Sequence, residues 1–368
     1  MKSYKYKLKP TIKQQGILNK TFGGCRFIYN WCLERRTIEY KTTGITLSYK
    51  QLAHEVSLLR SDSQFPWLKD ISSTALQCSV RNLINSYERF FRTKKGFPKY
   101  KSKYKSKCTA CYTSNYKFDF INWKVKIPMC GWVKICRSRD FDTHIKTGTL
   151  KVTKDKCGTY WCSINVYDNT IVEEKPIEES TAVGIDLGVK TYAVLSDGVS
   201  YDNPRFYEKE QKKLARLQRK FARTIVGSKR HSILNRKIAL CLRRVTNRRN
   251  NFLHNLSAQL INKYNTLCLE DLNVAKLLSL NSSKLSKSIQ SASWSEFKRQ
   301  LQYKAEEHGK HIITINRFIP SSKRCSKCGY INNNITLFDR KWRCPKCGVV
   351  LDRDLNAAIN IKKYALNI

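Results

Sequence analysis

Residues 344–360 read "CPKCGVVLDRDLNAAIN", and they place a pair of cysteines directly before two aspartates. A Cys-x-x-Cys pair is half of a typical zinc site. Asp352 and Asp354 follow it, and the residues after Asp354 have the pattern of a helix. Metal-binding thiols and carboxylates therefore share one short segment, in a chain of 368 residues whose formal net charge is +42.

The charge predicts a polyanionic partner. The chain has 70 Lys and Arg residues against 28 Asp and Glu residues. Such an excess costs stability through self-repulsion, and nucleic acid is the first partner that would compensate it. An anionic membrane is the alternative, but no apolar run approaches the ~20 residues of a spanning helix, and the start has no signal-peptide pattern. We expect nucleic acid as partner and no membrane.

The cysteines point to a reducing compartment. The chain has 15 of them, and those outside the zinc-like pairs are scattered, mostly in apolar contexts. A disulfide framework belongs to small extracellular domains, so a reducing interior fits better. A cytoplasmic, nucleoid-associated protein of a bacterium or archaeon is the default expectation, with eukaryotic and viral hosts as alternatives.

Two cysteine pairs form the predicted metal centre. Cys325 and Cys328 make the first pair, and Cys344 and Cys347 the second. Four thiolates suit tetrahedral Zn²⁺ and leave no open position, so we predict one structural zinc ion. Two disulfides are the competing interpretation, and the spacing disfavours them.

Three carboxylates are the predicted catalytic residues. Asp186 in "GIDLG" and Glu270 in "LCLED" each end a predicted buried strand, and Asp354 opens the last helix. A carboxylate at such a strand end is costly unless it is paired or metal-bound. Three of them could hold two catalytic Mg²⁺ ions and cleave phosphodiesters. Asp352 competes for this role but is expected to cap the helix, and Asp271 is expected to stay exposed.

Hydrophobic periodicity divides the chain. A strand at the start and a set of short strands after a helical segment predict one β domain, residues 1–10 and 105–175, interrupted by helices at 11–104. The second half predicts an α/β domain at 181–320 with a helical hairpin at 206–264. The cysteine segment, 321–350, and a last helical segment, 351–368, follow.

Residues 209–250 carry fifteen Lys and Arg residues and one acid, Glu210. Like charges at i,i+4 repel each other, so this basic face predicts polyanion binding rather than a solvated surface. Two apolar stripes, Leu214, Leu217 and Phe221, then Leu234, Ile238 and Leu242, predict the seam of the hairpin. The candidate nucleic-acid contacts are Arg216, Arg219 and Arg223, with Lys99 and Lys101 from the basic loop "GFPKYKSK".

The segments "GIDLGVKTYAVLSDG", "CLEDLNV" and "SSKRCSKCG…RKWRCPKCGVVLDRDLNAAINI", in this order, resemble the TnpB family of transposon-encoded proteins, which are related to type V CRISPR effectors and to the Fanzor proteins. The N-terminal "YKYKLKPTIKQQ" and "FGGCRFIYNWCL" fit the same family, so the resemblance covers nearly the whole chain. It implies catalytic roles for Asp186, Glu270 and Asp354.

The resemblance also implies a fold and partners. The fold would be a ribonuclease H-like (RuvC) nuclease domain with an inserted zinc ribbon, preceded by a small β-barrel (wedge) domain that a helical recognition segment interrupts. The family binds a guide RNA transcribed from the transposon end and cuts double-stranded DNA next to a short motif. The helix at 72–91 and the first helix are the candidates for contacting that motif. Ser73 and Gln77, near the start of the helix at 72–91, could reach base edges, with capping of that helix as the alternative role of Ser73.

Three alternatives stay open. A nuclease-inactive, nucleic-acid-binding regulator of the same fold would share all these motifs. A transposase that joins strands would need the same metals. "GIDLG" also resembles the first phosphate loop of actin-type ATPases, although those proteins are not strongly basic and no second phosphate loop is convincing here.

Overall fold

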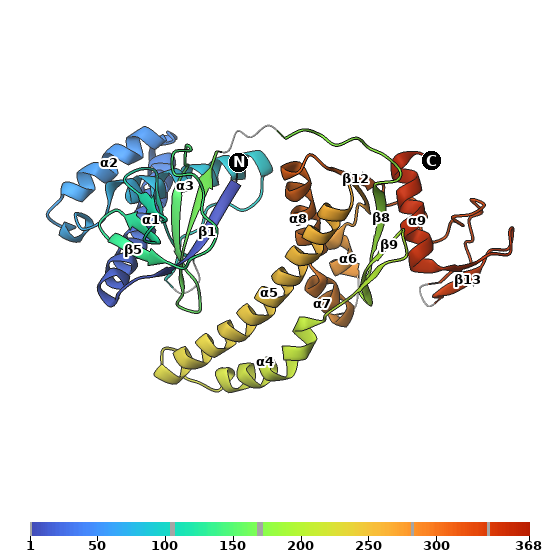
Figure 1. The fold of residues 1–368 in the computed structure, drawn as a ribbon. Helices are drawn as coiled ribbons and strands as arrows, with labels where there is room; N and C mark the ends of the chain where they lie inside the picture. The colour runs from blue at the N-terminus through green and yellow to red at the C-terminus, as the bar shows by residue number, and fades with distance from the viewer. Residues whose placement is uncertain (1, 104–106, 168–171, 281–282, 337–338) are drawn as a thin grey trace. The chain divides into compact units, whose positions relative to one another are not determined.

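The computed structural model describes residues 2–103, 107–167, 172–280, 283–336 and 339–368. The chain divides into two compact units, Met1–Thr170 and Ile171–Ile368, each with hydrophobic cores of its own (Figure 1). Among the helices described, none combines the length and the apolar character that crossing a membrane requires.

A seven-stranded antiparallel sheet organises the first unit. Its order is β2-β6-β7-β1-β5-β4-β3, so β1 lies between β7 and β5 although helices separate it from them in sequence. The domain boundaries stay a prediction. The described pairings leave β2 and β3 at the two edges, and closure into a barrel stays a prediction. The strands are β1 (Lys2–Lys9), β2 (Cys108–Tyr112), β3 (Lys117–Asp119), β4 (Lys124–Ile127), β5 (Gly131–Ile135), β6 (Leu150–Lys154) and β7 (Tyr160–Val166).

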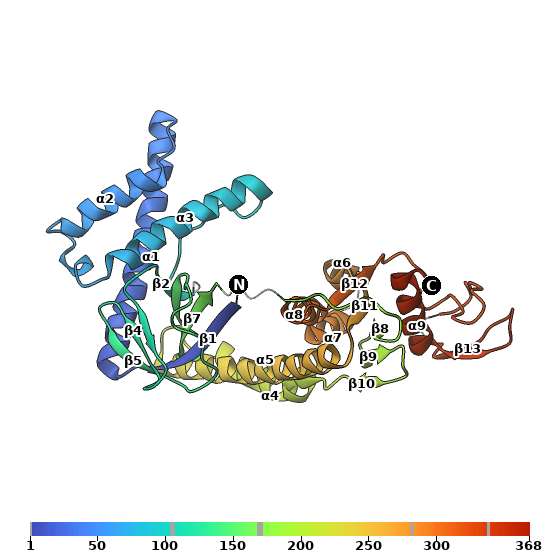
Figure 2. The ribbon, with the colours of Figure 1, turned by 45° about the horizontal axis from the view of Figure 1, so that its top comes forward.

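The helices of this unit are α1 (Ile12–Thr43), α2 (Tyr49–Ser61) and α3 (Ser73–Thr93), with a 3₁₀ turn at Pro66–Leu68 (Figure 2). A capping box of Thr11 and Gln14 starts α1. The helix predicted at 72–91 is thus present as α3, and its apolar residues Leu76, Val80 and Leu83 are buried against α1 and α2. Sequence reasoning did not anticipate α2.

A five-stranded mixed sheet organises the second unit, with the order β10-β9-β8-β11-β12. β8, β11 and β12 run parallel, and β9 and β10 are antiparallel additions. Ile185 pairs with Leu269, so the next residues, Asp186 and Glu270, lie side by side at the carboxyl ends of β8 and β11. The strands are β8 (Ala182–Leu187), β9 (Thr191–Leu195), β10 (Ser200–Asp202), β11 (Thr266–Glu270) and β12 (His311–Ile315).

The basic hairpin consists of α4 (Phe206–Ala222) and α5 (Lys229–Lys263), which pack on each other (Figure 1). One detail of the prediction was wrong, because Leu242 is 41% exposed. The neighbouring Cys241, together with Val245 and Leu234, is buried instead. Leu234 is thus buried as expected, but the buried side of α5 continues through Cys241 and Val245 instead of Leu242.

Helices α6 (Val274–Leu280), α7 (Ser283–Ala292) and α8 (Trp294–Glu307) follow β11. The last helix, α9 (Arg353–Leu366), packs on β8. A Cβ atom at Gly184 would lie 2.0 Å from the carbonyl oxygen of Ala358, so the glycine before Asp186 permits this close approach. The cysteine segment carries β13 (Lys341–Arg343) and β14 (Val350–Asp352).

Candidate active site and metal centre

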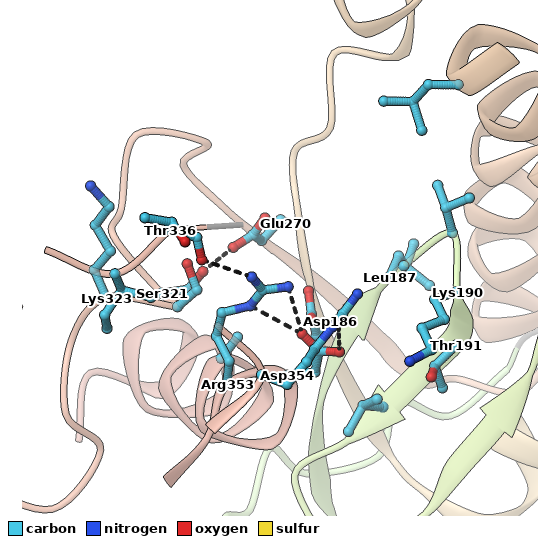
Figure 3. A pocket seen from close by; sticks show the side chains of 18 of the residues that line it. Asp186, Leu187, Lys190, Thr191, Glu270, Ser321, Lys323, Thr336, Arg353 and Asp354 are labelled. Atoms are coloured by element: carbon cyan, nitrogen blue, oxygen red, sulfur yellow. Dashed lines mark hydrogen bonds and ion pairs between the residues drawn. The ribbon is translucent and has the colours of Figure 1, made fainter. Parts of the chain in front are cut away.

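Asp186, Glu270 and Asp354 line one cavity of about 730 Å³. Figure 3 shows the three carboxylates around the same space, supplied by β8, β11 and the first turn of α9. The structure thus brings together three side chains that are far apart in the sequence. The cavity is also lined by basic residues, namely Lys190, Arg205, Lys323, Arg340 and Arg353.

The cavity changes the acidity of its carboxyl groups. The pKa of Asp186 is raised to about 7, chiefly by burial and then by the carboxylates of Glu270 and Asp354, against a lowering effect of Arg353. Burial also raises the pKa of Glu270, and the Ser321 hydroxyl, which donates to it, lowers that pKa. Clustered carboxylates of this kind are stabilised by a bound cation, and their oxygens are the ligands that Mg²⁺ prefers.

Asp354 is held by its neighbours. Asp352 caps α9 by accepting from the backbone N–H groups of Asp354 and Leu355, as predicted. The Arg340 Nη1 atom lies 2.9 Å from Asp354 Oδ2, and the Arg353 Nη2 atom lies 3.3 Å from Oδ1 (Figure 3). Sequence reasoning missed both arginines, because nothing local distinguishes them among the many basic residues.

The four predicted metal ligands also come together. The sulfur atoms of Cys325, Cys328, Cys344 and Cys347 all lie within 4.8 Å of one another, with Cys325–Cys347 at 3.7 Å and Cys328–Cys344 at 3.5 Å. Thiolates at about 2.3 Å from a tetrahedral zinc ion would be about 3.8 Å apart, so the set fits. Among the described residues, no other group of three or more His, Cys, Asp or Glu side chains has all its ligand atoms within 4.8 Å of one another. The carboxylates of Asp186, Glu270 and Asp354 therefore lie farther apart than this limit.

Two asparagines join the cysteine segment to α9. Asn356 Nδ2 donates to the carbonyl oxygen of Arg324 at 2.7 Å, and its Oδ1 accepts from the Ser326 N–H at 2.9 Å. Asn360 Nδ2 donates to the carbonyl oxygens of Ser321 and Arg324. Both asparagines are buried. They were not predicted, although their spacing of four residues places them on one face of a helix.

The candidate nucleic-acid contacts fall in both units. Ser73 and Gln77 are exposed on one face of α3, and Lys99 is exposed in the loop after it. Lys101 differs, because its Nζ atom lies 3.4 Å from the centre of the Tyr29 ring and its backbone is bonded to Asn30. In the second unit, Arg216 and Arg219 are exposed on α4, and Arg223, the residue that caps the end of this helix, is also exposed.

Three family models match the chain. "Cas12f1-like, TNB domain" matches residues 294–361, and "Probable transposase" matches residues 163–281. "Helix-turn-helix domain" matches residues 1–44, which hold β1 and α1 in the structure. The first match includes the four cysteines and Asp354, and the second includes Asp186 and Glu270.

Two relatives are similar over most of their length, and a third over a shorter part. A Streptomyces pristinaespiralis protein named "Putative RNA-guided DNA endonuclease" is 34% identical over 98% of this chain and 88% of its own. InsQ of Escherichia coli K12, which has the same description, is 28% identical over 98% of this chain and 91% of its own. "TnpB-like protein L79" of Acanthamoeba polyphaga mimivirus is 32% identical over 38% of this chain and 27% of its own.

A solved structure shares the fold. The cryo-EM structure of a Cas12f1–sgRNA–target DNA complex contains a chain with a TM-score of 0.57 and 16% identity. The match covers 96% of this chain and 83% of that one.

Proposed function

The chain belongs to the TnpB family of transposon-encoded proteins, and we propose that it is an RNA-guided endonuclease that cleaves double-stranded DNA next to a short motif. Its long relatives carry the description of RNA-guided DNA endonucleases. The structural observation that carries the proposal is the single cavity into which three remote segments bring Asp186, Glu270 and Asp354.

The cavity offers what phosphodiester hydrolysis requires. The three carboxylates have the oxygen ligands for Mg²⁺, and two such ions, when bound, would supply an activated water and stabilise the leaving oxygen. Side chains of the protein would bind the DNA and orient a metal ligand. Lys190 and Arg205 in the cavity wall attract the phosphate backbone, and Arg340 orients the Asp354 carboxylate.

The same proposal assigns the domains. The mixed sheet with α9 packed on it would be the ribonuclease H-like (RuvC) domain, and the seven-stranded sheet the barrel-like wedge domain. The four cysteines would hold one structural zinc ion, because they fit a closed tetrahedral site. The zinc ribbon would then position α9 and its carboxylate.

The nucleic acids would bind to surfaces in both units. Guide RNA and the RNA–DNA heteroduplex present many phosphates, which the exposed arginines of α4 can contact without reading sequence. Ser73 and Gln77 on α3 would read the DNA motif, since both side chains are exposed and polar. Lys99 remains a candidate contact, whereas the ammonium of Lys101 is already engaged with Tyr29.

The RNA that copurifies with the protein tests the guiding. The protein is expressed with the DNA that flanks its gene, purified in moderate salt, and the bound RNA is sequenced. We expect one discrete RNA with a constant body and a tail that matches DNA beyond the element. Random RNA, or none, would contradict RNA guiding and leave an unguided DNA-binding activity.

A strand-joining transposase is the second candidate, because residues 163–281 match a model described as a probable transposase. It would use the same carboxylates, so only the product separates the two. Joined DNA ends would favour the transposase, and broken ends the nuclease. Motif-dependent binding without either product would indicate a nuclease-inactive regulator.

A further inference from the structure

A second cavity lies beside the catalytic one, in the same unit. Its volume is about 680 Å³, and it is lined by the ends of β11 and β12 and by α8. The charged and aromatic side chains that line it are those of Asp271, Lys298, Arg317 and Phe318. The ring of Phe318 is 85% exposed, which leaves a large apolar surface in water at the rim of a charged cavity.

The cavity carries a surplus of positive charge. The carboxylate of Asp271 is ion-paired with Arg317, and Lys298 Nζ lies 3.6 Å from its other oxygen. Two cations thus face one anion. The side chains of Arg317 and Lys298 are 40% and 35% exposed, so both can contact a further anion from solvent while Asp271 holds them in place.

This cavity and the catalytic cavity are lined by residues that are neighbours in the chain. Glu270 and Asp271 are consecutive, yet the first lines the catalytic cavity and the second lines this one. One segment contacts both, since Arg317 pairs with Asp271 and the Ser321 hydroxyl donates to Glu270. Phe318 is three residues from Ser321, so their Cα atoms are at most about 11 Å apart.

Two hydrogen bonds hold the backbone that carries the exposed Phe318 ring. The N–H of Phe318 donates to the Asn316 Oδ1 atom at 3.0 Å, and the N–H of Ile319 donates to the Asn316 carbonyl oxygen at 3.2 Å. These two bonds close a turn around Phe318. The turn holds the Phe318 backbone at the rim of the cavity, so its side chain starts from a defined position.

We propose that this second cavity is a nucleotide subsite for the single DNA strand that is being cut, in which Phe318 stacks on a base while Arg317 and Lys298 contact a neighbouring phosphate. An aromatic platform beside cationic side chains is the arrangement that binds single strands without sequence preference, because every base has a π face. Such tolerance suits a nuclease whose RNA supplies the sequence specificity. The inference rests on the nuclease function proposed above.

The test uses a fluorescent base in the DNA, 2-aminopurine, to report stacking, and leaves the protein and the RNA unlabelled. The protein with its copurified RNA is mixed, in buffer without Mg²⁺ and without chelator, with single-stranded DNA complementary to the RNA tail, and 2-aminopurine replaces one base at a time around the cut. Its fluorescence falls when it stacks. The variants are Phe318→Ala, Phe318→Leu, Phe318→Tyr and Phe318→Trp, with Ile121→Ala as the control, since Ile121 is 94% exposed in the other unit.

We expect quenching at one or two adjacent positions in the wild type, in the Tyr and Trp variants and in the control, and loss of it in the Ala and Leu variants. With Mg²⁺ added, kcat/KM for the same strand should fall about five- to 100-fold in Phe318→Ala. Unchanged quenching in Phe318→Ala would overturn the subsite. So would a Leu variant that behaves like the wild type, because it would mean apolar packing against protein or RNA.

The two proposals can fail separately. Position-specific quenching without cleavage in Mg²⁺ would support the subsite and contradict the nuclease function. Cleavage without quenching at any position would support the nuclease and contradict the subsite.

Discussion

The side-chain amide of Asn356 donates to the backbone carbonyl of Arg324 at 2.7 Å, one residue before the first cysteine of the metal centre. Asn356 lies two residues after Asp354 on α9. One helix therefore carries a predicted catalytic carboxylate and the bond that fixes the cysteine segment. This connection explains why thiols and carboxylates share the motif "CPKCGVVLDRDLNAAIN" in a strongly basic chain.

Replacing Asn356 should loosen the joint between the two sites. Asn356 is buried, so Asn356→Ala leaves the partly buried N–H of Ser326 without its acceptor, which costs about 1–3 kcal/mol. Cleavage should fall, while zinc content stays near one ion per chain. Lys363→Met is the matched control, because it removes an exposed bond to the Ser326 carbonyl and should change stability by less than about 0.5 kcal/mol. Equal losses of stability and of cleavage in the two variants would contradict a special role of Asn356 in connecting the cysteine segment to α9.

Loss of the zinc ion should lower DNA cleavage by disordering the segment that contacts Asp354. Cys344→Ser removes one of four thiol ligands, so the segment that pairs Arg340 with Asp354 should lose its order. We expect zinc content, measured by atomic emission, and DNA cleavage to fall together. Unchanged zinc content in this variant would contradict the four-cysteine site.

The raised pKa of Asp186 predicts a pH-dependent cost to the metal-free protein. Its pKa rises from 3.8 to about 7 on folding, so the folded state binds the proton more tightly, and stability is lost as the pH rises through this range. Asp186→Asn removes the charge and should raise the melting temperature in buffer without Mg²⁺ and without chelator more at pH 8 than at pH 5. The full cost is a few kcal/mol, at about 1.4 kcal/mol per pKa unit.

The same variant should lose cleavage and lose the stabilisation that Mg²⁺ gives the wild type. A gain in melting temperature that is equal at pH 5 and pH 8 would contradict the buried, raised carboxyl group.

Three arginines of α4 should contribute to RNA affinity through phosphates alone. Changing Arg216, Arg219 and Arg223 to Gln should lower the slope of log K against log salt by about 2, at about 0.7 per phosphate contact in single strands. Lys101→Met is the comparison, because its ammonium packs on Tyr29 and should affect stability of the first unit more than the salt slope. A triple variant with the wild-type slope would exclude α4 from the interface.

Local patterns in the sequence were enough to find the ligands. A carboxylate at the end of an apolar strand is costly without a partner, so Asp186 and Glu270 stood out, and the two cysteine pairs have the spacing of zinc ligands. Asp352 was correctly predicted as a cap because its place before a helical pattern decides the role. Each of these signals is contained in a few consecutive residues of the sequence.

Features that depend on tertiary packing could not be predicted in this way. Arg340 and Arg353 meet Asp354 only after the cysteine segment folds back on α9. The buried face of α5 follows Cys241 rather than Leu242, because the packing of α4, not hydrophobicity alone, selects the face. Helices α6 and α7 are short, and α7 is rich in Ser and Lys, so its periodicity is weak.

Cleavage of a supercoiled plasmid tests the central claim most directly. The plasmid carries the motif and a sequence matching the tail of the bound RNA, and a second plasmid carries a scrambled match. The wild type and Glu307→Gln, a change at an exposed carboxylate outside the cavity, should linearise the matched plasmid in Mg²⁺, while Glu270→Gln should leave it intact with RNA binding unchanged. Cleavage by Glu270→Gln at the wild-type rate, or equal cleavage of both plasmids by the wild type, would contradict the account.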